Sequence, residues 1–215
     1  MNARLSVVCC ALLLAACGKD APHTPPSHAA AKPAVAARAG TSALTVKEFH
    51  LGMNINEVPD AMIDLLAEHG LSDYGFTQVM RYSNGEQCVL LYDKGFLGPI
   101  ESRMHRRYTT QVAASKIQEA LQSACYNSDG VVVVRAGPDG RVNRVAFNHV
   151  DEFFDARDMK PAQFAQKIAH DYHLPPLQPN ADGSGWSDDT PDGTRLQVLV
   201  KQVFGIPVTR LVMGR

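Results

Sequence analysis

The chain has 215 residues, of which 45% are hydrophobic and 20% are charged, and its formal net charge at pH 7 is −1. This composition is typical of a globular protein long enough for one ordinary domain, or for two small similar ones, with a real core. Because no basic surplus is present, we expect no nucleic-acid partner.

The first residues have the three-part pattern of a secretory signal peptide. Residues 1–4 are short and basic, residues 5–16 are almost entirely apolar, and small residues precede Cys17. The apolar run is too short to span a membrane. Leu14-Ala15-Ala16-Cys17 resembles the bacterial lipobox, which implies that residues 1–16 are removed and that Cys17 is acylated. The alternative is an ordinary signal peptide cut at an Ala-x-Ala site, with no anchoring role for Cys17.

Residues 17–43 are predicted to be a tether. They are rich in alanine and proline and offer no apolar face, so we expect a flexible or partly extended chain. The lipobox resemblance, with Gly18 rather than aspartate after the cysteine, implies an outer-membrane lipoprotein that faces the periplasm. The inner membrane and the cell surface stay open as alternatives. The folded domain is then expected to cover residues 44–215.

The domain is predicted to start with a short strand near residues 44–46 and a helix that Gly70 ends. Asn54 is a good N-cap, and Glu57 three residues later is typical of a capping box. Apolar residues at helical spacing predict a buried stripe on this helix; they are Val58, Met62, Leu65 and Leu66.

Two hairpins are predicted next. Thr77–Tyr82 and Glu86–Tyr92 flank an Asn-Gly pair, the strongest short-range hairpin signal. Val131–Arg135 and Arg141–Phe147 are joined by a Gly-Pro-Asp-Gly turn. Four consecutive valines in the second hairpin indicate a central strand that is buried on both faces.

Two more helices and two C-terminal strands complete the predicted domain. The helices cover residues 110–125 and 160–172, and the strands cover 195–203 and 208–213. A helix followed by a hairpin thus occurs three times. We therefore predict an α+β, two-layer fold with an antiparallel sheet, helices on one face, and repeated helix–hairpin units.

The sequence also contains a weak internal echo. At one constant offset, four apolar positions of the first helical region match four of the last: Met53, Val58, Met62 and Leu66 match Met159, Phe164, Ile168 and Tyr172. Similar halves, 44–150 and 151–215, are one explanation. Chance is the other, because apolar helix stripes match easily.

The segment Phe49–Val58 resembles the opening of the SmpA/OmlA family, the small outer-membrane lipoproteins of the BamE type. These proteins have an aromatic residue, Gly-Met, a cap residue, and Glu or Gln before Val. β-Lactamase inhibitory proteins use a similar Gly-Met-cap-helix entry in a related architecture of helices and sheet. The resemblance implies a non-enzymatic, protein-binding α+β module.

Only two cysteines remain in the predicted folded domain, Cys88 and Cys125. In an oxidising periplasm we expect them to form a disulfide. Two buried free thiols, or a metal or redox pair, are the alternatives, although the Cys-x-x-Cys spacing of a redox motif is absent.

The strongest binding candidate in the sequence is a basic segment with one aromatic residue. Arg103, Arg106, Arg107 and Tyr108 are suited to gripping lipid phosphates or the carboxylates of an acidic protein. The alternative is a solvated loop whose charges offset acidic residues elsewhere in the chain.

The other polar motifs predict neither catalysis nor a metal or cofactor. His170 and His173 could reach one metal ion, but no further ligands are evident, and histidines at a helix end complement its dipole. The segment 180–189 has the oxygen density of a calcium loop, but proline stands where a bidentate glutamate is needed. Ser184 lacks the pattern of a nucleophile elbow, and Trp186 is either a core residue at a strand edge or an exposed binding anchor.

The sequence therefore predicts a membrane-anchored periplasmic lipoprotein that is not an enzyme and binds another envelope or periplasmic protein. Its role is expected in envelope assembly and maintenance, or as an inhibitor or immunity protein of a periplasmic enzyme. The alternative is a periplasmic hydrolase with an unrecognised active site.

Overall fold

The structure is a computed structural model that describes residues 43–95, 98, 102–103, 106, 109–203 and 206–215. The predicted signal peptide, the lipidation site Cys17 and nearly all of the predicted tether lie outside the described residues, as do Arg107 and Tyr108. The described strands are β1 (Thr45–Val46), β2 (Phe49–His50), β3 (Tyr74–Phe76), β4 (Met80–Arg81), β5 (Gln87–Asp93), β6 (Val132–Ala136), β7 (Val142–Phe147), β8 (Gln178–Pro179), β9 (Gly185–Asp189), β10 (Arg195–Val203) and β11 (Ile206–Gly214). The helices are a short 3₁₀ turn, η1 (Ile55–Glu57), followed by α1 (Val58–His69), α3 (Thr110–Asn127), α4 (Val150–Phe153) and α5 (Pro161–Asp171).

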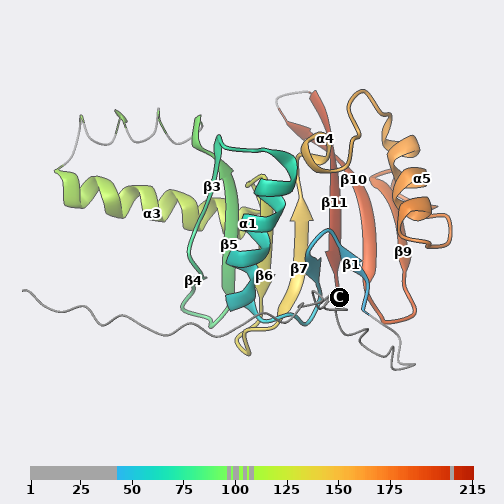
Figure 1. The fold of residues 1–215 in the computed structure, drawn as a ribbon, viewed down its shortest axis with the longest axis horizontal. Coiled ribbons are helices and arrows are strands. Elements are labelled where there is room, and N and C mark those ends of the chain that lie inside the picture. The colour runs from blue at the N-terminus through green and yellow to red at the C-terminus, as the bar shows by residue number, and fades with distance from the viewer. Residues whose placement is uncertain (1–42, 96–97, 99–101, 104–105, 107–108, 204–205) are drawn as a thin grey trace, which may run out of the picture. The chain divides into compact units, whose positions relative to one another are not determined.

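One antiparallel sheet of nine strands organises the fold (Figure 1). Its order is β3-β5-β6-β7-β11-β10-β9-β8, with β4 also paired to β5, while β1 and β2 form a separate two-stranded ribbon. The predicted run of valines lies at the centre of the N-terminal half, where Val131 to Val134 are at most 4% exposed. The α+β class with an antiparallel sheet is therefore confirmed.

The first helical region starts at the predicted N-cap Asn54, but the predicted capping box does not form, because the Glu57 side chain makes no capping hydrogen bond. The Asn54 side chain accepts a hydrogen bond from the Asn56 N–H at 3.0 Å and starts η1, which leads into α1. Gly70 ends the helix in the left-handed conformation, at φ 64°, which glycine adopts without steric cost. Three of the four predicted stripe residues are fully buried and Leu66 is partly buried.

The first hairpin forms around Gly85, but its first strand is shorter than predicted. Only Met80 and Arg81 of the predicted strand pair with β5 through the strand ladder. At Thr77 the side-chain hydroxyl takes the place of a backbone acceptor, because the Leu90 N–H donates to its Oγ1 at 3.1 Å. The strand is therefore interrupted, and pairing with β5 resumes at β3.

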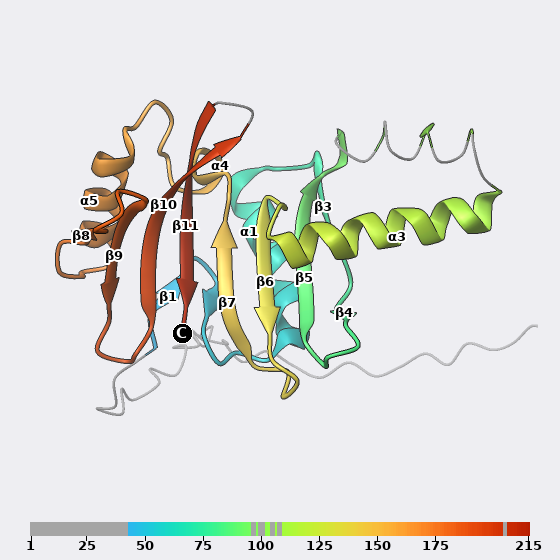
Figure 2. The same cartoon turned by 180° about the vertical axis from the view of Figure 1, so that it is seen from behind.

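Helix α3 lies on the opposite face of the sheet from α1 and α5 (Figures 1 and 2). Leu121 and Ala124 pack there on a small cluster with Leu90 and Val133, whereas Val89 belongs to the main core on the other face. The prediction that helices cover one face is thus wrong for α3. The physical reason is that β5 and β6 are apolar on both faces, so each face of this half needs a cover.

Both halves of the sheet have the same order of elements when each half is followed inward from its edge. Strands β3, β5, β6 and β7 follow α1, and β8, β9, β10 and β11 follow α5, so that the halves meet at β7 and β11. Met62 and Ile168, which the internal echo equates, are both fully buried in the main core. The helix–hairpin unit that contains α3 has no counterpart in the second half. Duplication itself stays a prediction.

The folded domain is fastened at its start by the turn between β9 and β10. Asp192 in this turn accepts hydrogen bonds from the Leu44 N–H at 3.0 Å, from the Thr194 N–H at 3.0 Å, and from the Thr190 and Thr194 hydroxyls. Burial raises the pKa of this carboxyl, but these hydrogen bonds outweigh burial and lower the pKa from 3.8 to about 2. The ionised form of Asp192 therefore stabilises the fold.

We predict that Asp192→Ala lowers the free energy of unfolding by about 1–2 kcal/mol at pH 7, because several donors lose a charged acceptor. The folded pKa lies below the unfolded value, so this contribution is present above about pH 4 and is lost as the pH falls through about 2. Urea denaturation across this range should show the gap between wild type and variant closing. Asp64→Ala, at an exposed position of α1, is the control, and an Asp192→Ala gap that does not depend on pH would contradict the prediction.

Candidate functional site: a row of arginines on the open face of the sheet

The C-terminal half of the sheet is covered on one face only. Helices α4 and α5 pack on the same side as α1, and no described helix lies on the other side of β7, β11, β10 and β9 (Figure 2). We call this outward side of the four strands the open face. Its middle is formed by four residues that are opposite one another in the register: Ala146, Val212, Gln197 and Ser187.

Three arginines lie in one line across this side of the sheet. Arg135 is opposite Arg144, Arg144 is opposite Gly214, and Gly214 is opposite Arg195, in neighbouring strands from β6 to β10. Directly paired residues of an antiparallel sheet project to the same face. We call Arg135, Arg144 and Arg195 the arginine row. Gly214 interrupts the row, because it contributes no side chain.

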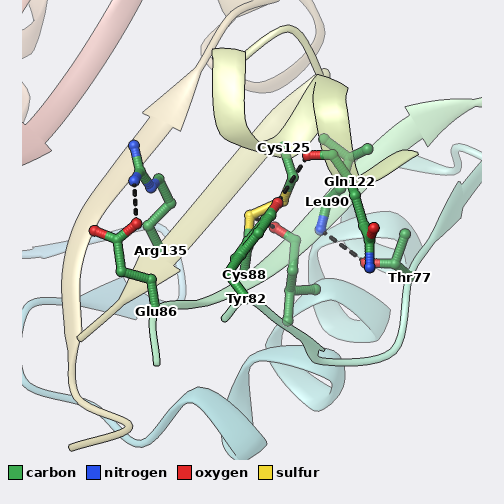
Figure 3. The surroundings of a disulfide bond; sticks show 9 residues. Thr77, Tyr82, Glu86, Cys88, Leu90, Gln122, Cys125 and Arg135 are labelled. Carbon is green, nitrogen blue, oxygen red and sulfur yellow. Dashed lines mark hydrogen bonds and ion pairs between the residues drawn. A yellow bond between two sulfur atoms is a disulfide. The ribbon is translucent and has the colours of Figure 1, made fainter. Parts of the chain in front are cut away.

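The row begins beside a disulfide. Cys88, which is opposite Arg135, is bonded to Cys125 of α3, in agreement with the predicted pairing, and the two Cα atoms are 6.4 Å apart (Figure 3). The Tyr82 hydroxyl donates to the backbone oxygen of Gln122 at 2.8 Å and adds a second link between α3 and the sheet.

An exposed aromatic residue follows the second cysteine. Tyr126 is 60% exposed, and its ring centroid lies 5.7 Å from Cζ of Arg135. The disulfide thus fixes the end of α3 so that an aromatic face stands at the end of the arginine row. Cation–π contacts of this kind orient a guanidinium group as well as stabilising it.

The arginines act on one another electrostatically. Burial lowers the pKa of Arg144, and the positive charge of Arg135 lowers it further. Burial also lowers the pKa of Arg210, a residue of β11, and so does the charge of Arg144, while Asp129 opposes this effect. Like charges are therefore close enough to repel on this face of the sheet.

Acidic residues balance only some of the positive charges on this face of the sheet. Arg135 pairs with Glu86 at 2.9 Å, Lys201 with Asp129 at 3.1 Å, and Arg195 with Asp189 at 3.9 Å.

The remaining two arginines have no carboxylate partner in the described part of the chain. Arg210 donates only to neutral oxygens, of Asn148 and Ser128. Arg144 is exposed and has no hydrogen bond or ion pair with any described residue. Two guanidinium groups therefore keep donors available for an external anion.

Such an arrangement is suited to binding. A guanidinium group presents a planar fork of donors that matches a carboxylate or phosphate in two parallel hydrogen bonds. The row itself contains no nucleophile and no general base. Arginine and tyrosine are also the residue types enriched where protein partners bind most strongly.

The predicted basic segment is only partly described. Arg103 and Arg106 are exposed, and Arg107 and Tyr108 lie outside the described residues. Its candidacy stays a prediction.

The histidine pair does not form a metal site with other described residues. The His170 side chain is 88% exposed and lies 3.2 Å from a carboxylate oxygen of Asp171, while His173 follows the end of α5. No group of three or more possible ligands exists among the described histidines, cysteines and carboxylates. A cavity of about 570 Å³ beside α5 is lined by His170, Asp158 and Asp171, but His173 does not line it and it is wide open to solvent.

The calcium-like segment folds as a self-bonded turn. Oδ1 of Asn180 accepts from the Ser187 hydroxyl at 2.7 Å, and Oδ1 of Asp182 accepts from the Ser184 N–H at 2.9 Å. Trp186 packs against the main core, which agrees with the core interpretation. The side-chain oxygens of Asn180 and Asp182 are thus used to build the turn.

The sequence did not point to the arginine row. Its members are spread over three strands and sixty residues of chain, so no local window contains them. Only Arg135 interrupts an otherwise apolar run, whereas Arg144 follows Asn143 and Arg195 is the first residue of its strand. Only the strand order brings the three arginines into one line.

Comparison with models of known protein families, with curated proteins and with solved structures found no match to this chain. Among the described residues, no helix has both the length and the apolar character needed to cross a membrane.

We predict that the disulfide is a major support of the fold. Its cysteines are 37 residues apart, and closing a loop of this length stabilises by about 4 kcal/mol in the chain-entropy model. Reduction with dithiothreitol should lower the free energy of unfolding by up to this amount and should speed hydrogen exchange in α3. A Cys88→Ala/Cys125→Ala double variant is the control, because the reductant should not affect it. An unchanged wild-type denaturation midpoint under reduction would refute the prediction.

Proposed function

We propose that this chain is a lipid-anchored envelope protein whose α+β domain binds another protein through the open face of its sheet. The observation that carries the proposal is the arginine row, with Tyr126 beside it and with Arg144 and Arg210 lacking carboxylate partners among the described residues. The arginines lie on strands of the sheet rather than on loops.

The size of the open face supports a protein partner. Strands are about 4.8 Å apart and rise about 3.4 Å per residue, so the 29 residues of these four strands offer roughly 470 Å². A standard protein interface buries about 800 Å² on each partner. The open face therefore supplies more than half of such a surface, and Tyr126 at its rim adds to it.

The membrane anchor and the periplasmic location rest on the sequence. The lipobox resemblance implies an acyl chain on Cys17, and the proline- and alanine-rich residues 17–43 would let the domain reach a partner away from the membrane. The disulfide is consistent with an oxidising compartment. The resemblance of Phe49–Val58 to the SmpA/OmlA family favours a role in envelope assembly, and inhibition of a periplasmic enzyme is the second possibility of the same class.

We predict that Cys17→Ser moves the protein out of the membrane fraction, because the only proposed acylation site is lost. Fractionation of cells that express the full chain, with immunodetection, measures this directly. Cys10→Ser is the matched control, since residue 10 lies within the segment that is removed. A Cys17→Ser protein that stays with the membrane as the wild type does would refute the lipid anchor.

We predict that a photo-crosslinker in place of Gln197, on the open face, captures one defined envelope protein in living cells. The same crosslinker in place of Gln166, an exposed residue of α5, should not capture it, because α5 lies on the other side of the sheet. An outer-membrane barrel complex as partner would favour envelope assembly, and a soluble enzyme in a one-to-one complex would favour inhibition. Equal capture from both positions, or none, would contradict the proposal.

A further inference from the structure

We propose that the partner presents an acidic segment, and that one of its carboxylates sits above Gly214 between Arg144 and Arg195. This inference rests on the proposed protein-binding function and specifies its chemistry. It follows from the register of the arginine row, from the missing side chain within it, and from the charges that the described residues leave unbalanced.

The gap at Gly214 has a suitable width. Arg144, Gly214 and Arg195 lie on three neighbouring strands, so the backbones of the two arginines are about 10 Å apart. Two guanidinium groups can converge from both sides on an anion placed between them. The bare backbone of Gly214 then forms the floor of the site.

Packing does not demand glycine at this position. A Cβ built on Gly214 would meet only the Asn143 backbone oxygen at 3.7 Å and Cγ of Arg144 at 4.0 Å, both ordinary contacts. By contrast, a Cβ on Gly185 in β9 would lie 2.0 Å from the Val198 oxygen, so that glycine is required by the fold. The open floor at Gly214 is therefore not a consequence of tight packing.

The positive charge that the arginines leave unbalanced favours an acidic ligand. Arg144 is next to Arg135, and the two repel. Neither Arg144 nor Arg210 forms an ion pair with a described carboxylate, although Asp129 attracts Arg210 from a greater distance. A carboxylate placed between Arg144 and Arg195 would gain charge-assisted hydrogen bonds and would relieve this repulsion. Asp189, 3.9 Å from Arg195 and exposed, is too loosely placed to compete strongly.

A protein carboxylate fits better than a membrane phosphate. Each basic residue near an anionic membrane contributes about 1 kcal/mol, so two unbalanced arginines would supply only roughly 2 kcal/mol. Buried Ala146 and Val212 lie beside the row on the same face of the sheet, and exposed Tyr126 lies at its end. Apolar residues, an aromatic rim and arginine donors together are typical of a protein interface.

The test measures binding of a fluorescein-labelled octaglutamate peptide to the full lipoprotein in neutral detergent micelles, by fluorescence anisotropy at low salt. We expect Arg144→Gln and Arg195→Gln each to weaken binding roughly tenfold or more, with Arg144→Lys in between, because lysine keeps the charge but loses the fork. Arg157→Gln is the matched control, an exposed arginine between α4 and α5, and should change affinity by less than about twofold.

A second variant tests the geometry rather than the charge. Gly214→Val places two γ-carbons on the floor of the site and should weaken peptide binding as strongly as Arg144→Gln does. Gly214→Ala is its control for stability, because a Cβ at this position meets only ordinary contacts and should leave thermal unfolding nearly unchanged. If Arg144→Gln and Gly214→Val both bind the peptide as Arg157→Gln does, the site is wrong. The proposal is also overturned if inorganic phosphate, or phosphatidylglycerol added to the micelles, displaces the peptide at equal concentration.

The experiments distinguish failure of the acidic site from failure of the proposed binding function. If crosslinking at position 197 captures a partner and Arg144→Gln leaves that capture unchanged, the acidic site fails while the binding function survives. If no partner is captured at all, the binding function fails, whatever the peptide does.

Discussion

The fold depends on one constraint: strands β5 and β6 are apolar on both faces. Val89 and Val134 face the core beneath α1, while Leu90 and Val133 face the other side of the sheet. Water must be kept from both sides, so this half of the sheet needs two covers. Helix α1 supplies the first. Helix α3 supplies the second, but only two of its residues, Ala113 and Cys125, are fully buried, and for this reason the disulfide and the Tyr82 hydrogen bond matter for holding it in place.

The strands that α3 does not cover have a different pattern of burial. Strands β7, β11, β10 and β9 bury one face against α4 and α5 and place polar residues such as Gln197 and Ser187 on the other. The small apolar residues that remain, Ala146 and Val212, are still buried, at 1% and 2% exposure, amid longer polar neighbours. The boundary between the covered and the open half runs beside Tyr126 and Arg135. A charged surface carried by strands thus results from covering only half of one face.

Local signals predicted the elements well, because capping and turn chemistry act over a few residues. Asn54 and Gly70 bracket the start and end of the first helical region, the Asn-Gly pair marks the first hairpin, and the valine run marks a central strand. The side on which α3 packs could not be predicted, because a helix stripe shows that a helix is buried but not against which face. The arginine row was hidden for a related reason: Arg144 and Arg195 become neighbours of Gly214 only through the strand order, which the pairing of β7 with β11 determines.

The electrostatics of the row separate it from an ordinary charged surface. Exposed ion pairs contribute little, and a surface under selection for solubility alone usually intersperses both signs of charge. Burial is the main cause that lowers the pKa of Arg144 and of Arg210. The charge of Arg135 lowers the pKa of Arg144 further, and the charge of Arg144 does the same to Arg210, where Asp129 opposes it. Arginine nevertheless stays charged at neutral pH. A ligand that brings negative charge to Gly214 would gain hydrogen bonds from Arg144 and Arg195 and would offset the positive charge of the row. The row therefore favours an acidic partner over neutral competitors.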